Sequence, residues 1–483
     1  MIGSLKGAPG TVETWSALLA RRDARTPAVV APGATWSMAE LLARAGNAAG
    51  WLDRVRAPAG VPVPALLSAS APGLALALGA AASHRPLAPL GPRLTAHELG
   101  ACVAPLGGDL LVADRGAAAL AAEVSAATGR RVELLPDFDR GPARPLPLDP
   151  PPDALVAILH TSGTTGLPRP VEMREDRMAA RVAVNRAVLD LGPGDLYASA
   201  SGFHHIAGLG MQLAALAAGA AVALLPTFDI DAWRQVGELG ITHALLVPTM
   251  IERLLAAGAL ATPRLRVLQY GAAPIHRDTL VAALEALPGV ELVQVFGQTE
   301  GSPITYLSDH DHRRALAGRP ELLASIGRAV PGTEIRVENP GRDGVGELCA
   351  RGPHLFRIDP AGWLRTGDLA LIDAEGYAFL AGRRGDKIIR GGENVYPVEV
   401  EDVLVQHPAV AEAAVVGVAD REFGETIRAH VVLAPGASAG EGELQAFVRG
   451  RLAGFKVPTS WVFQTELPRS SLGKVVRRRL LEN

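Results

Sequence analysis

The sequence lacks the features of a disulfide-stabilised fold, a cysteine-bound metal centre or a nucleic-acid-binding surface. Only two of its 483 residues are cysteines, Cys102 and Cys349, too few and too far apart for a disulfide framework or a cysteine zinc site. The formal net charge is -3, from 47 basic and 50 acidic residues, so no broad positive field favours a nucleic-acid backbone. We therefore expect a reducing, cytoplasmic environment and no nucleic-acid partner.

Aromatic residues and long uninterrupted apolar runs are also scarce. The sequence is 48% hydrophobic but only 4% aromatic, which predicts a core built mostly from Ala, Val and Leu. Two apolar runs, 64–83 and 209–226, are mostly Ala and Gly, and Pro72 and Gly73 break the first, so we expect buried helix and strand instead of membrane spans. In the second run Gly219 is expected to end a helix before the strand "AVALLP". The N-terminal "MIGSLKGAPGTVETW" has no apolar segment after its lysine and does not predict a secretory signal.

The order of apolar and polar segments predicts an α/β fold. Short apolar runs alternate with helical stretches between 154 and 297, as in "ALVAILH", "ITHALLVP", "LRVLQYG" and "VELVQVFG", which favours a mainly parallel sheet covered by helices. From about 325 the segments become shorter and punctuated by glycine, which predicts hairpins in a small β-rich subdomain. After 384 a helix, two strands and a second helix form a compact tail. We therefore predict a large N-terminal domain of residues 1–383 and a smaller α+β domain of residues 384–483.

The stretch "LHTSGTTGLPRPV", residues 159–171, combines small and hydroxyl-bearing residues directly after a predicted buried strand. Gly163 and Gly166 allow the backbone to approach an anion closely, while Thr161, Ser162, Thr164 and Thr165 add hydroxyl donors. The usual P-loop pattern, in which two glycines with four residues between them precede Lys-Ser/Thr, is missing. The composition alone fits either a phosphate-binding loop or an ordinary loop.

Further motifs follow in a fixed order and decide between these readings. They are "GAAP" (271–274), "QVFGQTEGSP" (294–303), "GWLRTGDL" (362–369), "GRRGDKIIRGGENVYPVEVE" (382–401) and "LPRSSLGKVVRRRL" (467–480). Together with the hydroxyl-rich loop they resemble the motifs of the adenylate-forming superfamily, which contains acyl-CoA synthetases, peptide-synthetase adenylation domains and luciferases, and the chain resembles the acyl-CoA synthetases most. The resemblance implies that a carboxylate attacks the α-phosphate of ATP to give an acyl-adenylate, and that the thiol of coenzyme A then forms a thioester and releases AMP.

The resemblance implies a role for individual residues in binding ATP and magnesium. Glu300, with Thr161, matches the magnesium site, since hard oxygen ligands suit that ion. Phe296 matches the residue that stacks on adenine, and Asp368 and Arg383 match those that contact the ribose, although a core phenylalanine and a surface ion pair are the plainer readings. The implied ATP site comprises Thr161, Ser162, Gly163, Thr164, Thr165, Gly166, Gly271, Ala272, Ala273, Pro274, Phe296, Gly297, Gln298, Thr299, Asp368, Arg383 and Lys474.

The C-terminal motifs imply a mobile domain that serves both half-reactions. Lys474 matches the catalytic lysine that reaches the carboxylate and α-phosphate, although a basic C-terminal run is more often a solvated end. Gly385 occupies the hinge position, where the family usually has Asp or Lys, and its freedom keeps rotation possible. Arg169 likewise replaces the family's usual lysine after Pro168. The implied tunnel for the thiol arm of coenzyme A is formed by Arg390, Gly391, Gly392 and Glu393.

The acyl pocket is implied by "SGFHHIAGLGMQ", residues 201–212, in which His204 fills an aromatic slot and His205 a histidine slot. The implied lining is His204, His205, Gly208, Tyr270, Gly271, Gly297 and Pro303, and we expect its small residues to leave room for a bulky acid. No aspartate is present there to bind a substrate ammonium, which argues against an amino acid. The metal-like "SDHDHRR", residues 308–314, is expected to be a polar loop because its ligands are adjacent.

Three alternatives to an acyl-CoA synthetase stay open. An acyl-AMP ligase would use the same site but load a carrier protein or an amine. A luciferase-type oxidation would need a special substrate. A non-catalytic nucleotide- or acyl-binding homologue would be expected to lose Glu300 or Lys474, and both are present.

Overall fold

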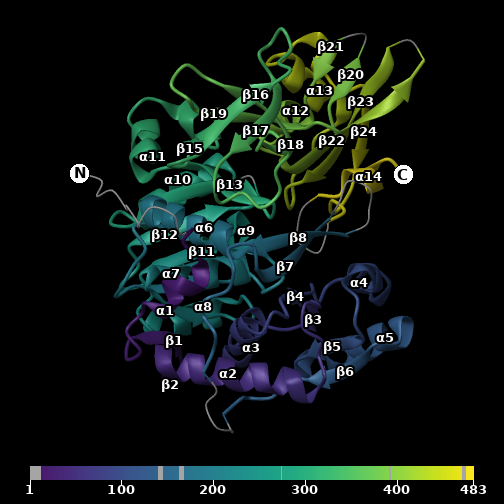
Figure 1. The fold of residues 1–483 in the computed structure, drawn as a ribbon. Coiled ribbons are helices and arrows are strands. Elements are labelled where there is room, and N and C mark those ends of the chain that lie inside the picture. The colour runs from purple at the N-terminus through teal and green to yellow at the C-terminus, as the bar shows by residue number, and fades with distance from the viewer. Residues whose placement is uncertain are drawn as a thin grey trace. The chain divides into compact units, whose positions relative to one another are not determined.

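The computed structural model describes residues 12–139, 145–162, 168–273, 275–390, 393–421, 423–469 and 475–482 (Figure 1). Its contacts divide the chain into two compact units. Unit 1 comprises Met1–Glu334 and Arg351–Leu364, and unit 2 comprises Ile335–Ala350 and Arg365–Asn483. Residues 335–350 and 365–383, which the sequence analysis placed in the large domain, thus group with the C-terminal residues. The hinge near residue 385 remains a prediction.

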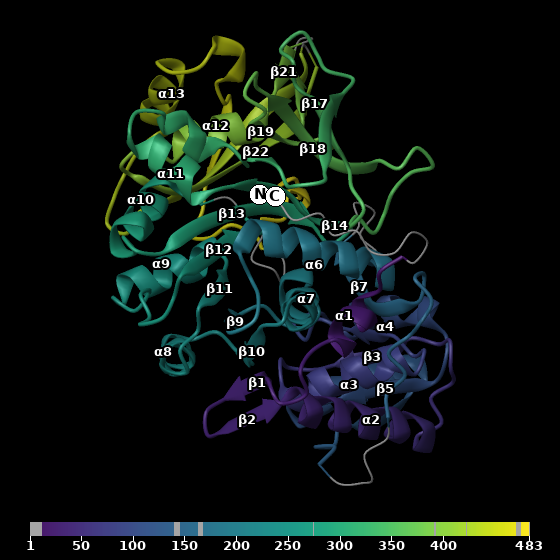
Figure 2. The ribbon, with the colours of Figure 1, turned by 60° about the vertical axis from the view of Figure 1, so that its left-hand side comes forward.

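The larger sheet of unit 1 has nine strands among the described residues, in the order β15-β14-β13-β12-β11-β9-β10-β1-β2 (Figure 2). The strands are β1 (Pro27–Ala31), β2 (Ala34–Ser37), β9 (Leu196–Ser199), β10 (Ala221–Leu224), β11 (His243–Leu246), β12 (Val267–Gly271), β13 (Glu291–Gln298), β14 (Gly301–Leu307) and β15 (Arg328–Ala329). All neighbours from β1 to β13 pair in parallel, and β2, β14 and β15 are antiparallel at the edges. The predicted mainly parallel sheet is confirmed.

Helices cover both faces of this sheet, as Figure 2 shows. On one face lie α6 (Glu175–Leu189) and α7 (Met211–Ala218), whose apolar residues pack on Leu245, Val267 and Val293. On the other face lie α8 (Ile230–Glu238), α9 (Pro248–Ala256) and α10 (Arg277–Ala286), which pack with Leu246 and Leu268. Burial on both faces explains why the strands are almost wholly apolar.

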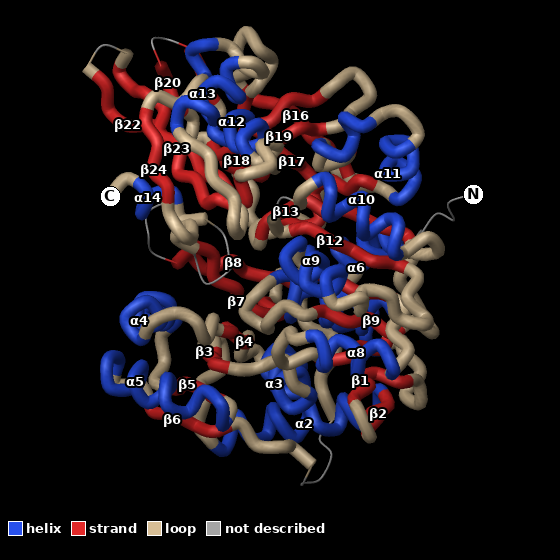
Figure 3. Tube along the Cα trace, turned by 180° about the vertical axis from the view of Figure 1, so that it is seen from behind, coloured by secondary structure: helices blue, strands red, loops and turns tan. Residues whose placement is uncertain are grey.

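A second sheet of unit 1 has the order β6-β5-β3-β4-β7-β8. Its strands are β3 (Val63–Leu66), β4 (Leu87–Pro89), β5 (Leu110–Ala113), β6 (Arg131–Leu134), β7 (Leu155–Ser162) and β8 (Pro168–Arg174). The helices of this region are α2 (Met38–Arg54), α3 (Ala71–Ala82), α4 (Ala96–Val103) and α5 (Ala118–Thr128), and α5 lies beside β5 and β6 (Figure 3), whereas α1 (Trp15–Ala20) packs on α6 and α7. Since Thr161 and Ser162 are the last residues of β7, this sheet positions the start of the hydroxyl-rich loop.

The two apolar runs fold as predicted. The first contains β3 and α3. In the second, α7 ends at Gly219, whose φ of 104° lies in the left-handed region, and β10 follows directly. Among the described residues, no helix is long and apolar enough to cross a bilayer.

Unit 2 contains two sheets. The first has the order β16-β17-β18-β19, with β16 (Glu334–Glu338), β17 (Gly346–Arg351), β18 (Leu364–Ile372) and β19 (Ala378–Arg383). The second has the order β21-β20-β23-β22 with β24 beside β23, and comprises β20 (Ile388–Arg390), β21 (Glu393–Val395), β22 (Val410–Asp420), β23 (Gly424–Leu433) and β24 (Ser460–Phe463). The helices α12 (Pro397–Leu404) and α13 (Glu441–Arg449) confirm the predicted tail, and α14 (Arg477–Leu480) follows.

Candidate active site

The end of β7 and the turn between β13 and β14 meet in unit 1. The hydroxyl Oγ1 of Thr161 donates a hydrogen bond of 3.3 Å to Oε1 of Glu300, which is 139 residues away in sequence. The two residues that the motifs assigned to magnesium therefore lie side by side, although they come from different sheets. Both contribute oxygen atoms, which are the ligands that magnesium prefers.

Two glycines allow the backbone to turn at Glu300. A Cβ atom on Gly297 would lie 2.8 Å from the side chain of Ser302, and one on Gly301 would lie 2.6 Å and 2.7 Å from the side chains of Leu355 and Leu364. At Gly297 a side chain would also meet the backbone of residues 301 and 302, at 2.9 Å, so close approach requires a glycine there. At Gly301 a side chain would displace the terminal methyl groups of the two leucines.

The "GAAP" segment follows the neighbouring strand. Gly271 pairs with Val295, and a Cβ atom on Gly271 would lie 2.2 Å from the carbonyl oxygen of Val295. Ala272 has a φ of 67°. This left-handed conformation is unfavourable in free energy for any residue that has a side chain. Phe296, the next residue on β13 after Val295, is only partly buried and belongs to neither core cluster of this sheet. The segments assigned to adenine thus leave adjacent parallel strands at the same sheet edge.

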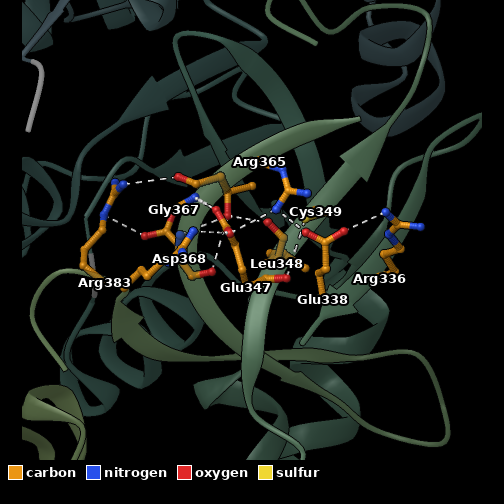
Figure 4. Close-up of polar contacts among 11 residues, drawn as sticks. Arg336, Glu338, Glu347, Leu348, Cys349, Arg365, Gly367, Asp368 and Arg383 are labelled. Carbon is orange, nitrogen blue, oxygen red and sulfur yellow. Dashed lines mark hydrogen bonds and ion pairs between the residues drawn. The ribbon is translucent and has the colours of Figure 1, made fainter. Parts of the chain in front are cut away.

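The two residues assigned to the ribose form an ion pair in unit 2 (Figure 4). Asp368 on β18 pairs in register with Arg383 on β19, and Nε of Arg383 lies 2.7 Å from Oδ1 of Asp368. Asp368 is 7% exposed, whereas the side chain of Arg383 is 50% exposed, so only the carboxylate of the pair is buried. The carboxylate of Asp368 offers acceptor oxygens of the kind that two ribose hydroxyls require.

Glu347 on β17 is a buried carboxylate that the sequence analysis missed. Its Oε1 accepts a 3.2 Å hydrogen bond from the backbone N–H of Gly367, beside Asp368. Its Oε2 lies 3.0 Å from Arg384 and 3.5 Å from Arg365, as Figure 4 shows for the latter. Glu347 therefore connects the "TGD" turn to the residue before Gly385. The only feature of the sequence that could have indicated a role for Glu347 is its charge inside the otherwise apolar strand "GELCA".

The acyl-pocket motif is tightly packed. The rings of His204 and His205 have centroids 3.9 Å apart, and burial, helped by nearby Arg93, lowers the pKa of His204 to about 4. His204 is therefore neutral at pH 7, and its Nδ1 has no hydrogen-bond partner among the described residues. A Cβ atom on Gly208 would lie 1.9 Å from the carbonyl oxygen of Gly202. Glycine is therefore required at position 208 by the close backbone, and the expected room for a bulky acid stays a prediction.

Tyr270 contributes its side chain to the core. It is 1% exposed, and its hydroxyl lies 2.7 Å from Nε2 of His312. Its predicted place in the lining of the acyl pocket stays a prediction. His312 belongs to α11 (Asp309–Leu316), which begins with a capping box between Ser308 and Asp311. The predicted polar loop at 308–314 is thus a helix, which is stabilised where the Ser308 hydroxyl accepts from the backbone N–H of Asp311. The described residues contain no group of three or more His, Cys, Asp or Glu side chains that could hold a metal.

The remaining predicted residues are dispersed. Gly385 is exposed, and nothing lies within 4 Å of a Cβ atom built on it. Arg390 donates to the carbonyl oxygens of Phe455 and Val457 at 2.9 Å and 3.4 Å, and Glu393 is exposed. The predicted site residues outside the described residues are Gly163, Thr164, Thr165, Gly166, Pro274, Gly391, Gly392 and Lys474.

Comparison with known proteins places these features in one family. Residues 17–358 match the model of the AMP-binding enzyme family, and residues 399–474 match that of the AMP-binding enzyme C-terminal domain. The chain belongs to the AMP-binding enzyme family. The predicted α/β fold, the adenylate-forming superfamily and the class of acid–thiol ligases close to the acyl-CoA synthetases are therefore confirmed.

Three relatives illustrate the family. The fatty acid–[acyl-carrier-protein] ligase ScoC of Streptomyces coeruleorubidus is 33% identical over 95% of this chain and 94% of its own. The indoleacetate–CoA ligase of Aromatoleum aromaticum is 35% identical over 68% of each chain. The structure of the amide bond synthetase McbA from Marinactinospora thermotolerans has a TM-score of 0.86 and 28% identity, and it covers 97% of this chain and 98% of that one.

Proposed function

We propose that this AMP-binding enzyme is an ATP- and magnesium-dependent synthetase that converts a non-amino carboxylic acid into its coenzyme A thioester. The observation that supports this most directly is the contact between Thr161 and Glu300. It joins the start of a phosphate-binding loop to a carboxylate that can hold a cation. Such a pair suits a reaction in which two anions, the carboxylate and the triphosphate, must be brought together.

The chemistry of the donor atoms fits magnesium. Glu300 and Thr161 would hold the ion through a carboxylate and a hydroxyl oxygen, and phosphate oxygens would complete its shell. A bound magnesium ion would withdraw negative charge from the phosphates.

The protein's own residues are proposed to act in two steps. In the first, Asp368 and Arg383 bind the ribose, and Lys474 stabilises the charge that develops as the carboxylate oxygen attacks the α-phosphorus and pyrophosphate leaves. In the second, the thiol attacks the acyl carbonyl, the bond to the phosphate breaks, and AMP leaves. Rotation at Gly385 would exchange Lys474 for the glycine-rich segment at 390–393 between the steps.

The acid is proposed to lack an amino group. The segment 201–212 contains no carboxylate to pair with a substrate ammonium, and His204 in its place is neutral because burial lowers its pKa to about 4. The names of ScoC and of the indoleacetate–CoA ligase also give acids without an amino group for those proteins. A neutral imidazole favours none of the fatty, aromatic and alicyclic acids over the others, so the acid class has to be found by experiment.

A carrier protein or an amine is the alternative acceptor. The relative that covers 95% of this chain is named as a ligase that acts with acyl-carrier protein, and McbA is an amide bond synthetase. These names favour testing both acceptors beside free coenzyme A. The first step would be the same for all three.

Adenylation is tested by ATP–pyrophosphate exchange with a panel of carboxylic acids that includes short-chain, long-chain, aromatic and alicyclic acids and amino acids. The variant Glu300→Gln is measured beside the wild type. We expect exchange with at least one non-amino acid, and a loss of about 100-fold in Glu300→Gln, because the amide cannot neutralise a cation. Exchange only with amino acids would contradict the proposed substrate class. Exchange that is unchanged in Glu300→Gln would contradict the assigned role of Glu300.

A further inference from the structure

The turn that carries Glu300 is fixed by hydrogen bonds that its backbone carbonyl oxygens accept from donors elsewhere in unit 1. The carbonyl oxygen of Glu300 accepts hydrogen bonds from the N–H groups of Phe356 and Arg357, at 2.7 Å and 3.2 Å. That of Ser302 accepts from Nη1 of Arg181, and that of Pro303 lies 2.6 Å from Nε2 of His354. Within residues 300–303, three of the four carbonyl oxygens thus face donors from two other segments, α6 and residues 354–357.

Arg181 is an unusual residue for this task. It lies on α6, which contacts β14 (Figure 2), and is 1% exposed. Burial lowers its pKa to about 10, so the guanidinium keeps its charge at pH 7. None of the ion pairs among the described residues includes Arg181, and its Nε has no hydrogen-bond partner there. A buried cation of this kind costs folding free energy that an apolar side chain would not, so fold stability does not explain it.

His354 holds the same turn from the other side. It is fully buried, and burial lowers its pKa to about 4, so it is neutral at pH 7. Since Nε2 faces a carbonyl oxygen, that nitrogen must carry the proton, and Nδ1 has no partner among the described residues. The ring therefore acts as a single fixed donor to Pro303.

The two supports are themselves connected through α6. Arg177, one helical turn before Arg181, donates to the carbonyl oxygen of Pro353 at 3.2 Å. Leu355 packs so closely on Gly301 that a Cβ atom there would lie 2.6 Å away. Helix α6, the segment 353–357 and the turn 300–303 thus form one packed arrangement, from which the carboxylate of Glu300 extends to Thr161.

We propose that Arg181 and His354 are positioning residues that fix the Glu300 turn so that its carboxylate stays aligned with Thr161 for the metal–nucleotide complex. The inference rests on the proposed role of Glu300. Neither residue needs to touch substrate, since each acts through a backbone carbonyl. The arrangement matches the general observation that groups behind a metal ligand set its orientation and tune its affinity.

The experiment measures binding of Mn²⁺ in the presence of ATP by electron paramagnetic resonance, and binding of ATP in excess EDTA by calorimetry. The variants are Arg181→Met, Arg181→Lys, His354→Phe and His354→Gln. Arg186→Met is the matched control, because Arg186 also lies on α6 and donates to backbone carbonyls, those of Ala217 and Ala218. Thermal unfolding of each variant is recorded in parallel.

We expect Arg181→Met and His354→Phe to weaken binding of the Mn²⁺–ATP complex by about tenfold or more, while binding of metal-free ATP changes less than about twofold. Arg181→Lys and His354→Gln keep a donor and should recover part of the loss. Equal weakening with and without metal, or a lower melting temperature alone, would overturn the proposal, as would an equal effect of Arg186→Met.

Glu300→Gln, measured in the same way, separates this inference from the proposed function. If Glu300→Gln loses Mn²⁺–ATP binding and the Arg181 and His354 variants do not, the positioning role is wrong and the role of Glu300 stands. If Glu300→Gln also binds normally, the metal assignment itself is wrong. The lysine and glutamine variants keep the test valid where Arg181→Met or His354→Phe does not fold.

Discussion

Asp368 and Arg383 face each other on neighbouring strands, with the carboxylate of the first 2.7 Å from the guanidinium of the second. Asp368 is almost fully buried, whereas the side chain of Arg383 is half exposed. A buried carboxylate held by an accessible arginine is well placed to exchange part of that contact for sugar hydroxyls.

Removal of this carboxylate should weaken ATP binding. Asp368→Ala is expected to raise the KM for ATP by about tenfold or more, because hydrogen bonds to a charged group are among the stronger ones. The KM for the acid should change little. Steady-state kinetics with each substrate varied in turn measures both effects. Asp53→Asn, which removes the exposed partner of Arg85, is the control and should leave both constants unchanged.

Stability should fall in mild acid because of His354. Its folded pKa, about 4, lies below the ordinary value of 6.5, as burial and the neighbouring Arg181 and Arg177 disfavour the proton. The unfolded chain therefore binds the extra proton first, so this contribution is complete above pH 6.5 and is lost as the pH falls toward 4. Between pH 7.5 and 5 the loss amounts to about 2 kcal/mol.

The variant His354→Gln tests this, since glutamine keeps a donor for Pro303 but does not titrate. Its unfolding midpoint in urea should depend less steeply on pH than that of the wild type between pH 7.5 and 5. Parallel pH profiles for the two proteins would show that His354 is not the titrating group.

Position 385 should tolerate a side chain in the folded protein. Gly385→Ala is expected to change stability by less than about 0.5 kcal/mol, because a Cβ atom there meets nothing within 4 Å. Gly367→Ala provides the contrast, since a φ of 73° makes alanine cost about 1 kcal/mol. If Gly385 is the hinge, Gly385→Ala should also slow thioester formation more than adenylation. A large fall in the melting temperature of Gly385→Ala would refute the expected stability. If Gly385→Ala slowed adenylation and thioester formation equally, the hinge assignment would be refuted.

Lys474 should serve only the first half-reaction. Lys474→Ala is expected to slow adenylation by about 100-fold or more, because a positive charge no longer meets the developing charge on phosphorus. Thioester formation from preformed acyl-adenylate should remain nearly normal. Rapid-quench measurement of each half-reaction separates the two rates, and an equal loss in both would refute the assignment.

The segments assigned to the nucleotide could be recognised in the sequence because each is a local pattern. A buried strand followed by glycine and polar residues is visible in a short window, as at Thr161, Gly271 and Glu300. The helix at 309–316 was missed although Ser308 and Asp311 have the spacing of a capping box, because the charged composition of the segment suggested a loop.

The supports of the site could not be predicted in this way. Arg181 meets Ser302 across 121 residues, and nothing in the helical pattern of α6 indicates that this arginine points inward. Glu347 similarly lies in a strand whose burial depends on neighbours that the local sequence does not specify. The packing at Gly208 depends on a carbonyl group brought close by the fold, which the local sequence does not specify either.

The most direct test of the account is a single-turnover reaction of the enzyme with ATP, magnesium and its best acid, followed by free coenzyme A. Product is identified by mass spectrometry beside parallel reactions with a phosphopantetheinyl carrier protein and with an amine. The account predicts that acyl-adenylate forms first and that coenzyme A converts it to a thioester with stoichiometric release of AMP. An adenylate that persists with coenzyme A but is consumed by the carrier protein or the amine would contradict it.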